Sequence, residues 1–197
     1  MATFDIKELF TSTNTSLTVA TKTYGSFHRE QGLEDTFHAA AGKLYLIEEA
    51  LDTTQPNVSP EDVPQAITAL LRSCKTTAEK IRTVFGELSK VQASERRECY
   101  VKLIQRKGRS YLVEILVRNM MDYVRRIAEN YETEDLQEQL TILKTEIDTL
   151  KSLPPSVPVE QQKRGHIITN NGGTQYNAMD NARQFNGNNF GGGANIY

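Results

Sequence analysis

The residues whose types and spacing suggest a chemistry lie mainly in segment 165–197. This segment is rich in Gly and Asn, and almost no charged residue interrupts it. It holds two similar halves, 170–177 and 183–189. Read inward from its outer end, each half gives Asn-Asn-Gly and then a Gln three residues further in, with one aromatic residue beside the Gln. The pattern is therefore pseudo-palindromic.

Such residues suit a hydrogen-bonded stack of identical strands. Asn and Gln side chains form ladders along a cross-β fibre, Ile and aromatic side chains interdigitate, and low charge avoids repulsion between layers ~4.8 Å apart. Composition alone also fits a flexible polar tail, but the near-symmetric spacing favours an amyloid. The predicted amyloid core comprises Ile167, Ile168, Asn170, Asn171, Gly172, Gln175, Tyr176, Asn177, Gln184, Phe185, Asn186, Gly187, Asn188 and Phe190.

Residue patterns of enzymes and metal sites are missing from the sequence. The three histidines are scattered, the two cysteines (Cys74 and Cys99) lack ligand spacing, and no GxSxG motif is present. We therefore expect no enzymatic activity, no metal and no cofactor. Two unpatterned thiols fit a reducing compartment. The N-terminus does not resemble a secretory signal, and no apolar run is long enough to span a membrane. We expect a cytoplasmic protein at rest.

Positive charge is concentrated in one part of the 197-residue chain. The whole chain has a formal net charge of -2, but residues 72–126 hold fourteen Lys/Arg against six Asp/Glu. A cluster of cations can bind anionic lipid headgroups, although many of these side chains have Glu residues near enough to pair with. Nucleic-acid binding is not favoured, because no aromatic platform is interleaved. The best candidates for membrane contact are Arg96, Arg97, Arg106, Lys107 and Arg109.

The apolar spacing predicts an all-α bundle of about five or six helices. Ser59 and Thr133 look like N-caps, with Pro60 as the first residue of a helix. The widest apolar stripe predicts a central helix covered on several sides. The narrow seam at 136–150 suits either dimerisation or packing on the bundle, and its short length favours packing. The predicted helices span 3–29, 33–53, 60–88, 94–107, 110–131 and 133–150.

These patterns predict a chain in three parts. A helical domain spans 1–153, and a Pro-containing linker spans 154–164 because proline ends helical structure. The tail at 165–197 cannot bury enough apolar area to fold alone, and we expect it to be disordered until it assembles.

At this level of detail the chain resembles a known family. Residues about 33–131 resemble the HeLo-like, SesA-type N-terminal domain of fungal NACHT receptors. The matching stretches are GLEDTFHAAAGKLYLIEEAL, ITALLRSCKTTAEKIRTVF and YVKLIQRKGRSYLVEILVRNMMDYVRRIAENYE. The tail resembles the pseudo-palindromic prion-forming motif of the same fungal system, a relative of the animal RHIM.

The resemblance implies a cell-death execution protein. A NACHT receptor with a similar motif would template the amyloid fold of the tail, and the clustered helical domains would then attack the plasma membrane. The chain departs from the family in residues 1–29, which are rich in Thr and Ser and only mildly apolar. This departure leaves open an alternative function, an adaptor that assembles through its tail without membrane activity.

Overall fold

The helices of the computed structural model follow the predicted apolar stripes. It describes residues 6–27, 32–59, 61, 63–131 and 133–162. These residues form helices and connecting turns, and none of them is in a β-strand. The protein is all-α, and the longer helices match the predicted five or six. The α-helices are α1 (Ile6–Gly25), α2 (Asp35–Ala41), α3 (Leu44–Thr54), α4 (Gln65–Leu88), α5 (Arg96–Lys107), α6 (Val113–Ala128), α7 (Glu134–Ser152) and α8 (Val159–Gln162).

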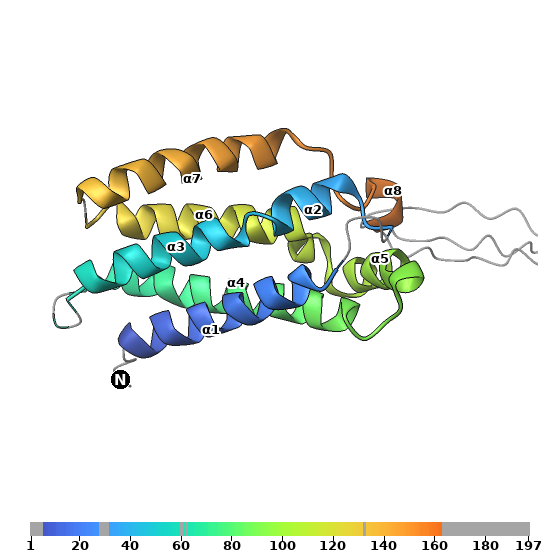
Figure 1. Ribbon diagram of the computed structural model, residues 1–197, viewed down its shortest axis with the longest axis horizontal. Coiled ribbons are helices and arrows are strands. Elements are labelled where there is room, and N and C mark those ends of the chain that lie inside the picture. Colours follow the sequence, from blue (N-terminus) through green and yellow to red (C-terminus); the bar gives the residue numbers. More distant parts are fainter. Residues whose placement is uncertain (1–5, 28–31, 60, 62, 132, 163–197) are drawn as a thin grey trace, which may run out of the picture. The chain divides into compact units, whose positions relative to one another are not determined.

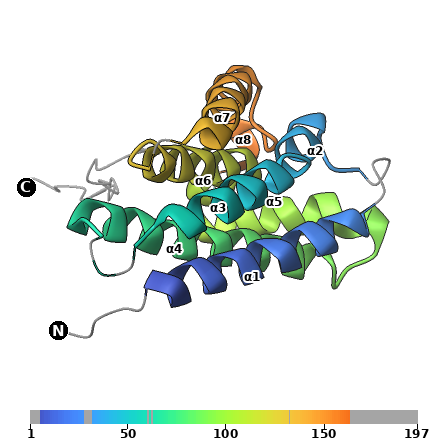
Figure 2. The same cartoon turned by 60° about the vertical axis from the view of Figure 1, so that its left-hand side comes forward.

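Helix α6 lies at the centre of the bundle. It contacts α2, α3, α4 and α7, and α1 packs along α4 and α3. Figures 1 and 2 show α1 and α7 on opposite sides of the bundle. Met120 and Met121 of α6 are completely buried, as is Cys74 of α4. The predicted central helix is therefore confirmed.

Helix α1 forms despite its many Thr and Ser residues. Several of their hydroxyl groups donate hydrogen bonds to the backbone carbonyl of a residue one turn earlier; the one from Thr13 to Leu9 is 2.7 Å long. These bonds satisfy hydroxyl groups that otherwise compete with the helix backbone. The helix also has an apolar face that packs on the bundle. Its residues Leu9, Phe10, Leu17 and Ala20 are each at most 1% exposed.

The predicted helix over 33–53 is wrong in one respect, because the structure breaks it into α2 and α3. The break lies at Gly42 and Lys43, where the Lys43 N–H donates to the carbonyl of Ala40 at 3.0 Å instead of continuing the helix ladder. A Cβ at Gly42 would lie 3.1 Å from the carbonyl oxygen of His38. Glycine permits this close approach, so the chain turns here.

The predicted helix start at Ser59 and Pro60 is also wrong. Pro60 lies outside the described residues, and α4 begins at Gln65, with Pro64 as the residue before it. The residue before a proline is disfavoured in the helical region. Val63 is therefore not helical. Pro64, with ψ 144°, is the N-cap residue before α4.

Helix α7 packs on the bundle, as predicted for the seam at 136–150. Its Leu136, Leu140, Leu143, Ile147 and Leu150 are buried, and it lies along α6 and α3. Its N-cap position is Thr133, as predicted, although the side chain of Thr133 forms no capping hydrogen bond.

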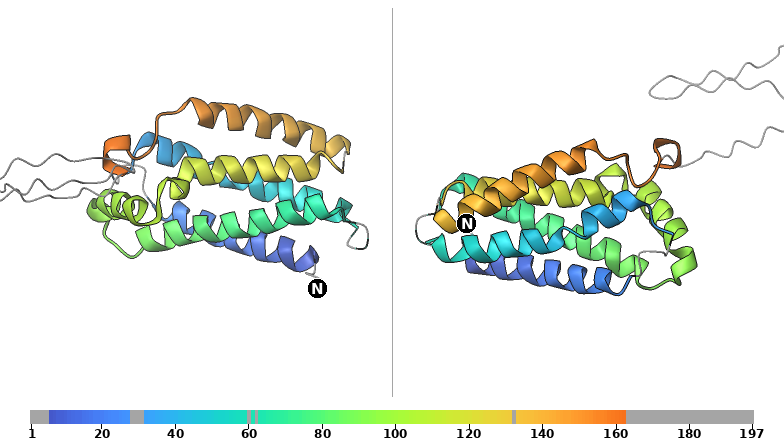
Figure 3. Two further views of the ribbon diagram at one scale, coloured as in Figure 1. Left: turned by 180° about the vertical axis from the view of Figure 1, so that it is seen from behind. Right: turned by 45° about the horizontal axis from the view of Figure 1, so that its top comes forward.

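The segment predicted as a linker at 154–164 differs from the prediction. Ser156 and Val157 are 3% and 1% exposed, and α8 follows directly and contacts α5. Figure 3 shows α5, α8 and the start of α6 at the same end of the bundle. The two prolines after α7 stop the helix, as expected. The chain then turns back onto the domain, because a buried partner for Ser156 exists there.

Candidate functional site

The candidate membrane-contact residues come from α5 and from η4 (Arg109–Tyr111), the short turn after it. Arg96 is held by the fold. Its guanidinium carbon lies 4.3 Å from the ring centroid of Phe27, and its Nε donates to the Leu88 carbonyl at 3.3 Å. A cation over an aromatic ring is a stabilising contact. Arg96 therefore closes the end of the bundle between α1 and α4.

Arg97 and Arg106 are paired with carboxylates from other elements. Arg97 lies 3.2 Å from Glu34, and Arg106 lies 2.6 Å from Glu87 of α4. Such exposed ion pairs contribute at most about 1 kcal/mol to stability, but the paired carboxylate weakens the attraction of each arginine for another anion. Three of the five predicted cations thus have partners within the domain.

Lys107 and Arg109 are exposed, and a third cation, Lys80 of α4, lies near the same aromatic ring as Lys107. The Nζ atoms of Lys80 and Lys107 lie 5.5 Å and 6.0 Å from the ring centroid of Tyr111. In the part of the chain that the structure describes, none of the three cations forms an ion pair with a carboxylate. We call this group, Lys80, Lys107 and Arg109 with Tyr111, the cationic corner.

The cationic corner can attract an anion. Two ammonium groups near one aromatic ring, neither of them in an ion pair with a described carboxylate, create a local positive potential. Sequence spacing missed Lys80 because it precedes Tyr111 by a long stretch of chain and lies on a different helix. Only the packing of α4 against η4 brings the two residues together.

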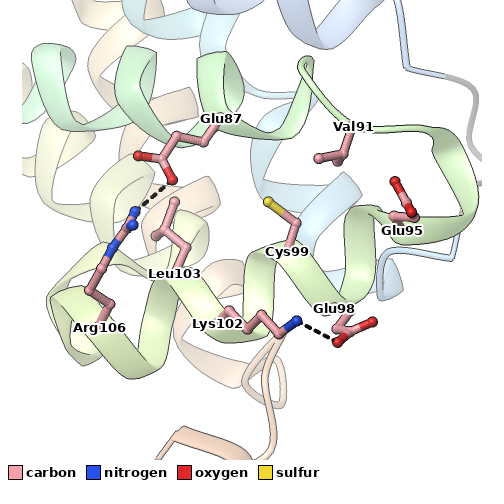
Figure 4. Close-up of a pocket in the computed structure, with 8 residues that line it drawn as sticks. All are labelled: Glu87, Val91, Glu95, Glu98, Cys99, Lys102, Leu103 and Arg106. Carbon is pink, nitrogen blue, oxygen red and sulfur yellow. Dashed lines mark hydrogen bonds and ion pairs between the residues drawn. The ribbon is translucent and has the colours of Figure 1, made fainter.

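A surface pocket of about 460 Å³ lies between the end of α4 and α5. Figure 4 shows two ion pairs in its lining: Arg106 with Glu87, and Lys102 with Glu98 at 2.6 Å. Burial, with a smaller effect of Glu87, raises the pKa of Cys99. The thiol therefore stays protonated and is a poor nucleophile. The pocket is lined by Glu87, Val91, Glu95, Glu98, Cys99, Lys102, Leu103 and Arg106.

The described residues lack two further features. They hold no group of three or more His, Cys, Asp or Glu side chains that could bind a metal ion. None of the described helices has the length and apolar character needed to cross a membrane. The predicted amyloid core, from Ile167 to Phe190, lies outside the described residues, and it stays a prediction.

Comparison with known proteins gives one result. The model of the SesA family, an N-terminal domain found on NACHT NTPases and P-loop NTPases, matches residues 10–127. The match begins within α1 and ends in α6, so it also includes most of the Thr-rich N-terminal helix. No curated protein and no solved structure matches the chain. The match covers more than half of the chain, so this protein belongs to the SesA family.

Proposed function

We propose that this protein is the effector of a cell-death pathway of the fungal innate-immunity or heterokaryon-incompatibility type. Its tail receives an amyloid signal from a NACHT receptor, and its clustered helical domains then act on the plasma membrane. One observation carries this proposal: a SesA-family domain, a type found on NACHT proteins, is followed closely by a Gly/Asn-rich, pseudo-palindromic tail.

The proposed role is not enzymatic and uses no cofactor. The partners are other copies of the chain, a NACHT receptor with a similar motif, and anionic lipids, but not nucleic acids. The protein rests in the cytoplasm and moves to the plasma membrane when its tail assembles. The second candidate, an adaptor without membrane activity, is favoured by the mildly apolar character of residues 1–29.

A charge placed in the predicted amyloid core tests the tail. Gln175→Lys or Ile168→Lys in the full chain stacks like charges every ~4.8 Å, and we expect thioflavin T fluorescence and electron microscopy to show no seeded fibres. Ala194→Lys adds the same charge outside the predicted core and should leave fibre growth intact. Normal fibre growth by both core variants would overturn this assignment.

A charge reversal tests the cationic corner. We expect Lys80→Glu with Lys107→Glu to weaken binding of the full chain to phosphatidylserine vesicles by roughly thirtyfold or more, since each cation near an anionic surface contributes about 1 kcal/mol. Flotation at two salt concentrations measures the effect. Arg82→Glu with Arg126→Glu changes the charge equally at other exposed positions and is the matched control.

Dye release from the same vesicles separates the two candidate functions. The effector releases dye once tail fibres are present, and the corner variant releases less. An assembled protein that never releases dye would support the adaptor. Equal vesicle binding by the corner variant and the control variant would show that the cationic corner does not contact the membrane.

A further inference from the structure

The residues that join the helical domain to the tail occupy a buried polar seat. Ser156 and Val157 are buried, and Leu153 packs partly buried against the core. The seat is formed by Tyr100 of α5 and Glu114 in the first turn of α6, both of which are also buried. We call residues 153–162 the strap.

The hydrogen bonds of this seat form one directed chain. The backbone N–H and the hydroxyl of Ser156 donate to the two carboxylate oxygens of Glu114 at 2.9 Å and 2.7 Å. The hydroxyl proton of Ser156 is thereby used, so Tyr100 must donate to Ser156 Oγ, 3.0 Å away. The oxygen of Tyr100 accepts the N–H of Val113, the first residue of α6, at 2.9 Å. Burial raises the pKa of Tyr100, which keeps its proton available.

Glu114 depends on the strap for its hydrogen bonds. Among the described residues its carboxylate forms no ion pair, and both hydrogen bonds of its side chain come from Ser156. A buried carboxylate is costly unless it is hydrogen-bonded or paired. Water can replace both hydrogen-bond donors when the strap leaves. The intramolecular bond is only modestly more stable than the bond to water. A polar seat of this kind holds a segment firmly and still allows it to open.

A second contact holds the far end of the strap. Gln105 Nε2 of α5 donates to the carbonyl of Gln161 at 2.8 Å, and Gln162 Nε2 donates to the carbonyl of Val157 at 2.6 Å. Only residues 163–166 lie between the strap and Ile167, the first residue of the predicted amyloid core. The spacer that the closed strap leaves to the tail is therefore short.

Stacking of the tails is incompatible with so short a spacer. Strands in a cross-β stack are ~4.8 Å apart, so two strands per chain place neighbouring chains roughly 10 Å apart, which is about the diameter of a single helix. A bundle of several helices is wider than this. Four extended residues reach only about 14 Å, whereas release of the ten-residue strap adds up to roughly 35 Å.

We propose that residues 153–162 form a strap that Glu114 holds closed at rest, and that crowding of the domains along the tail stack pulls open. The opening removes the hydrogen bonds that fix Glu114 and Tyr100, so tail assembly is transmitted to the start of α6 and to α5. This step rests on the proposed function, because the stack of tails supplies the pull.

Hydrogen exchange on the full chain tests the resting strap. Ser156→Ala removes one bond to a charged group, and we expect exchange of the amides at 156–162 to speed up about tenfold or more. Ser152→Ala is the control, since Ser152 is exposed and bonds only within α7, to the Thr149 carbonyl. Equal exchange rates in the wild-type, Ser156→Ala and Glu114→Ala proteins would show that Glu114 does not hold the strap.

Exchange in seeded fibres of the full wild-type chain tests the opening. We expect the protection of amides 156–162 to be lost. In a Cys99→Ser background, a reducible maleimide crosslink can join Gln105→Cys to Gln161→Cys and hold the strap closed. We expect this crosslink to block fibre growth until it is cleaved. Fibres in which these amides stay as protected as at rest would contradict the opening of the strap and would leave the proposed function unaffected. A chain that forms no fibres, even as Ser156→Ala, would overturn the proposed function and the strap with it.

Discussion

Deletion of residues 1–29 is expected to unfold the helical domain. Helix α1 buries Ile6, Leu9, Phe10 and Leu17 against the bundle, and each such side chain contributes roughly 1.5–3 kcal/mol. Their sum is comparable to the whole ~5–15 kcal/mol that keeps a domain folded. The deletion also uncovers Phe85 of α4, which is fully buried in the intact protein.

Circular dichroism during heating measures this effect. The truncated chain should show no cooperative transition, whereas deletion of residues 2–5, which precede α1, should leave the transition in place. A cooperative melt of the chain without residues 1–29 would show that α1 is an accessory element. It would also make the truncation a fair test of membrane insertion by this segment. If the domain unfolds, insertion must be tested by single changes on the exposed face of α1, such as Val19→Asp.

Phe37→Ala is expected to lower the free energy of unfolding by about 3–5 kcal/mol, the usual cost of truncating a fully buried aromatic residue. Phe37 is 0% exposed. Its ring centroid lies 5.1 Å from that of Tyr100 and 5.7 Å from that of Phe85, both in edge-on arrangements. Such contacts add to the transfer energy of the ring. The ring joins α2, α4 and α5, so the cavity would weaken three elements together.

Urea unfolding followed by circular dichroism measures this change. Tyr45→Ala is the control, because Tyr45 of the neighbouring α3 is 56% exposed and should cost well under 1 kcal/mol. The cavity also lies next to Tyr100, which supports the strap. Faster amide exchange at 156–162 in Phe37→Ala than in Tyr45→Ala would show that the aromatic cluster positions the seat of Ser156. A loss below 1 kcal/mol for Phe37→Ala would show that the bundle closes around the site.

Apolar periodicity was enough to predict the fold class and most helices. The stripe of α6 and the seam of α7 repeat at helical spacing, and a helix must bury such a face whatever its neighbours are. Gly108, with φ 90°, ends α5 where the sequence predicts, because few other residues adopt that conformation. These features depend on residues close together in the chain.

Local signals failed where two of them competed. Ser59 and Pro60 form a typical helix start, but Pro64 disfavours helix at the preceding residue, and α4 starts at Gln65. Gly42 lies inside the predicted helix over 33–53, yet the chain turns there, where the Gly42 backbone comes close to the His38 carbonyl.

The sequence by itself determined the helical periods, the apolar faces and the composition of segment 165–197, because these depend on residue type and short spacing alone. Only the tertiary structure decided the partners of the charged and polar groups. Lys80 meets Tyr111, and Ser156 meets Glu114, across separations of 31 and 42 residues that carry no periodic signal. Such contacts follow from how whole helices pack. In this protein they hold the strap, which the sequence predicts as a linker, against the helical domain.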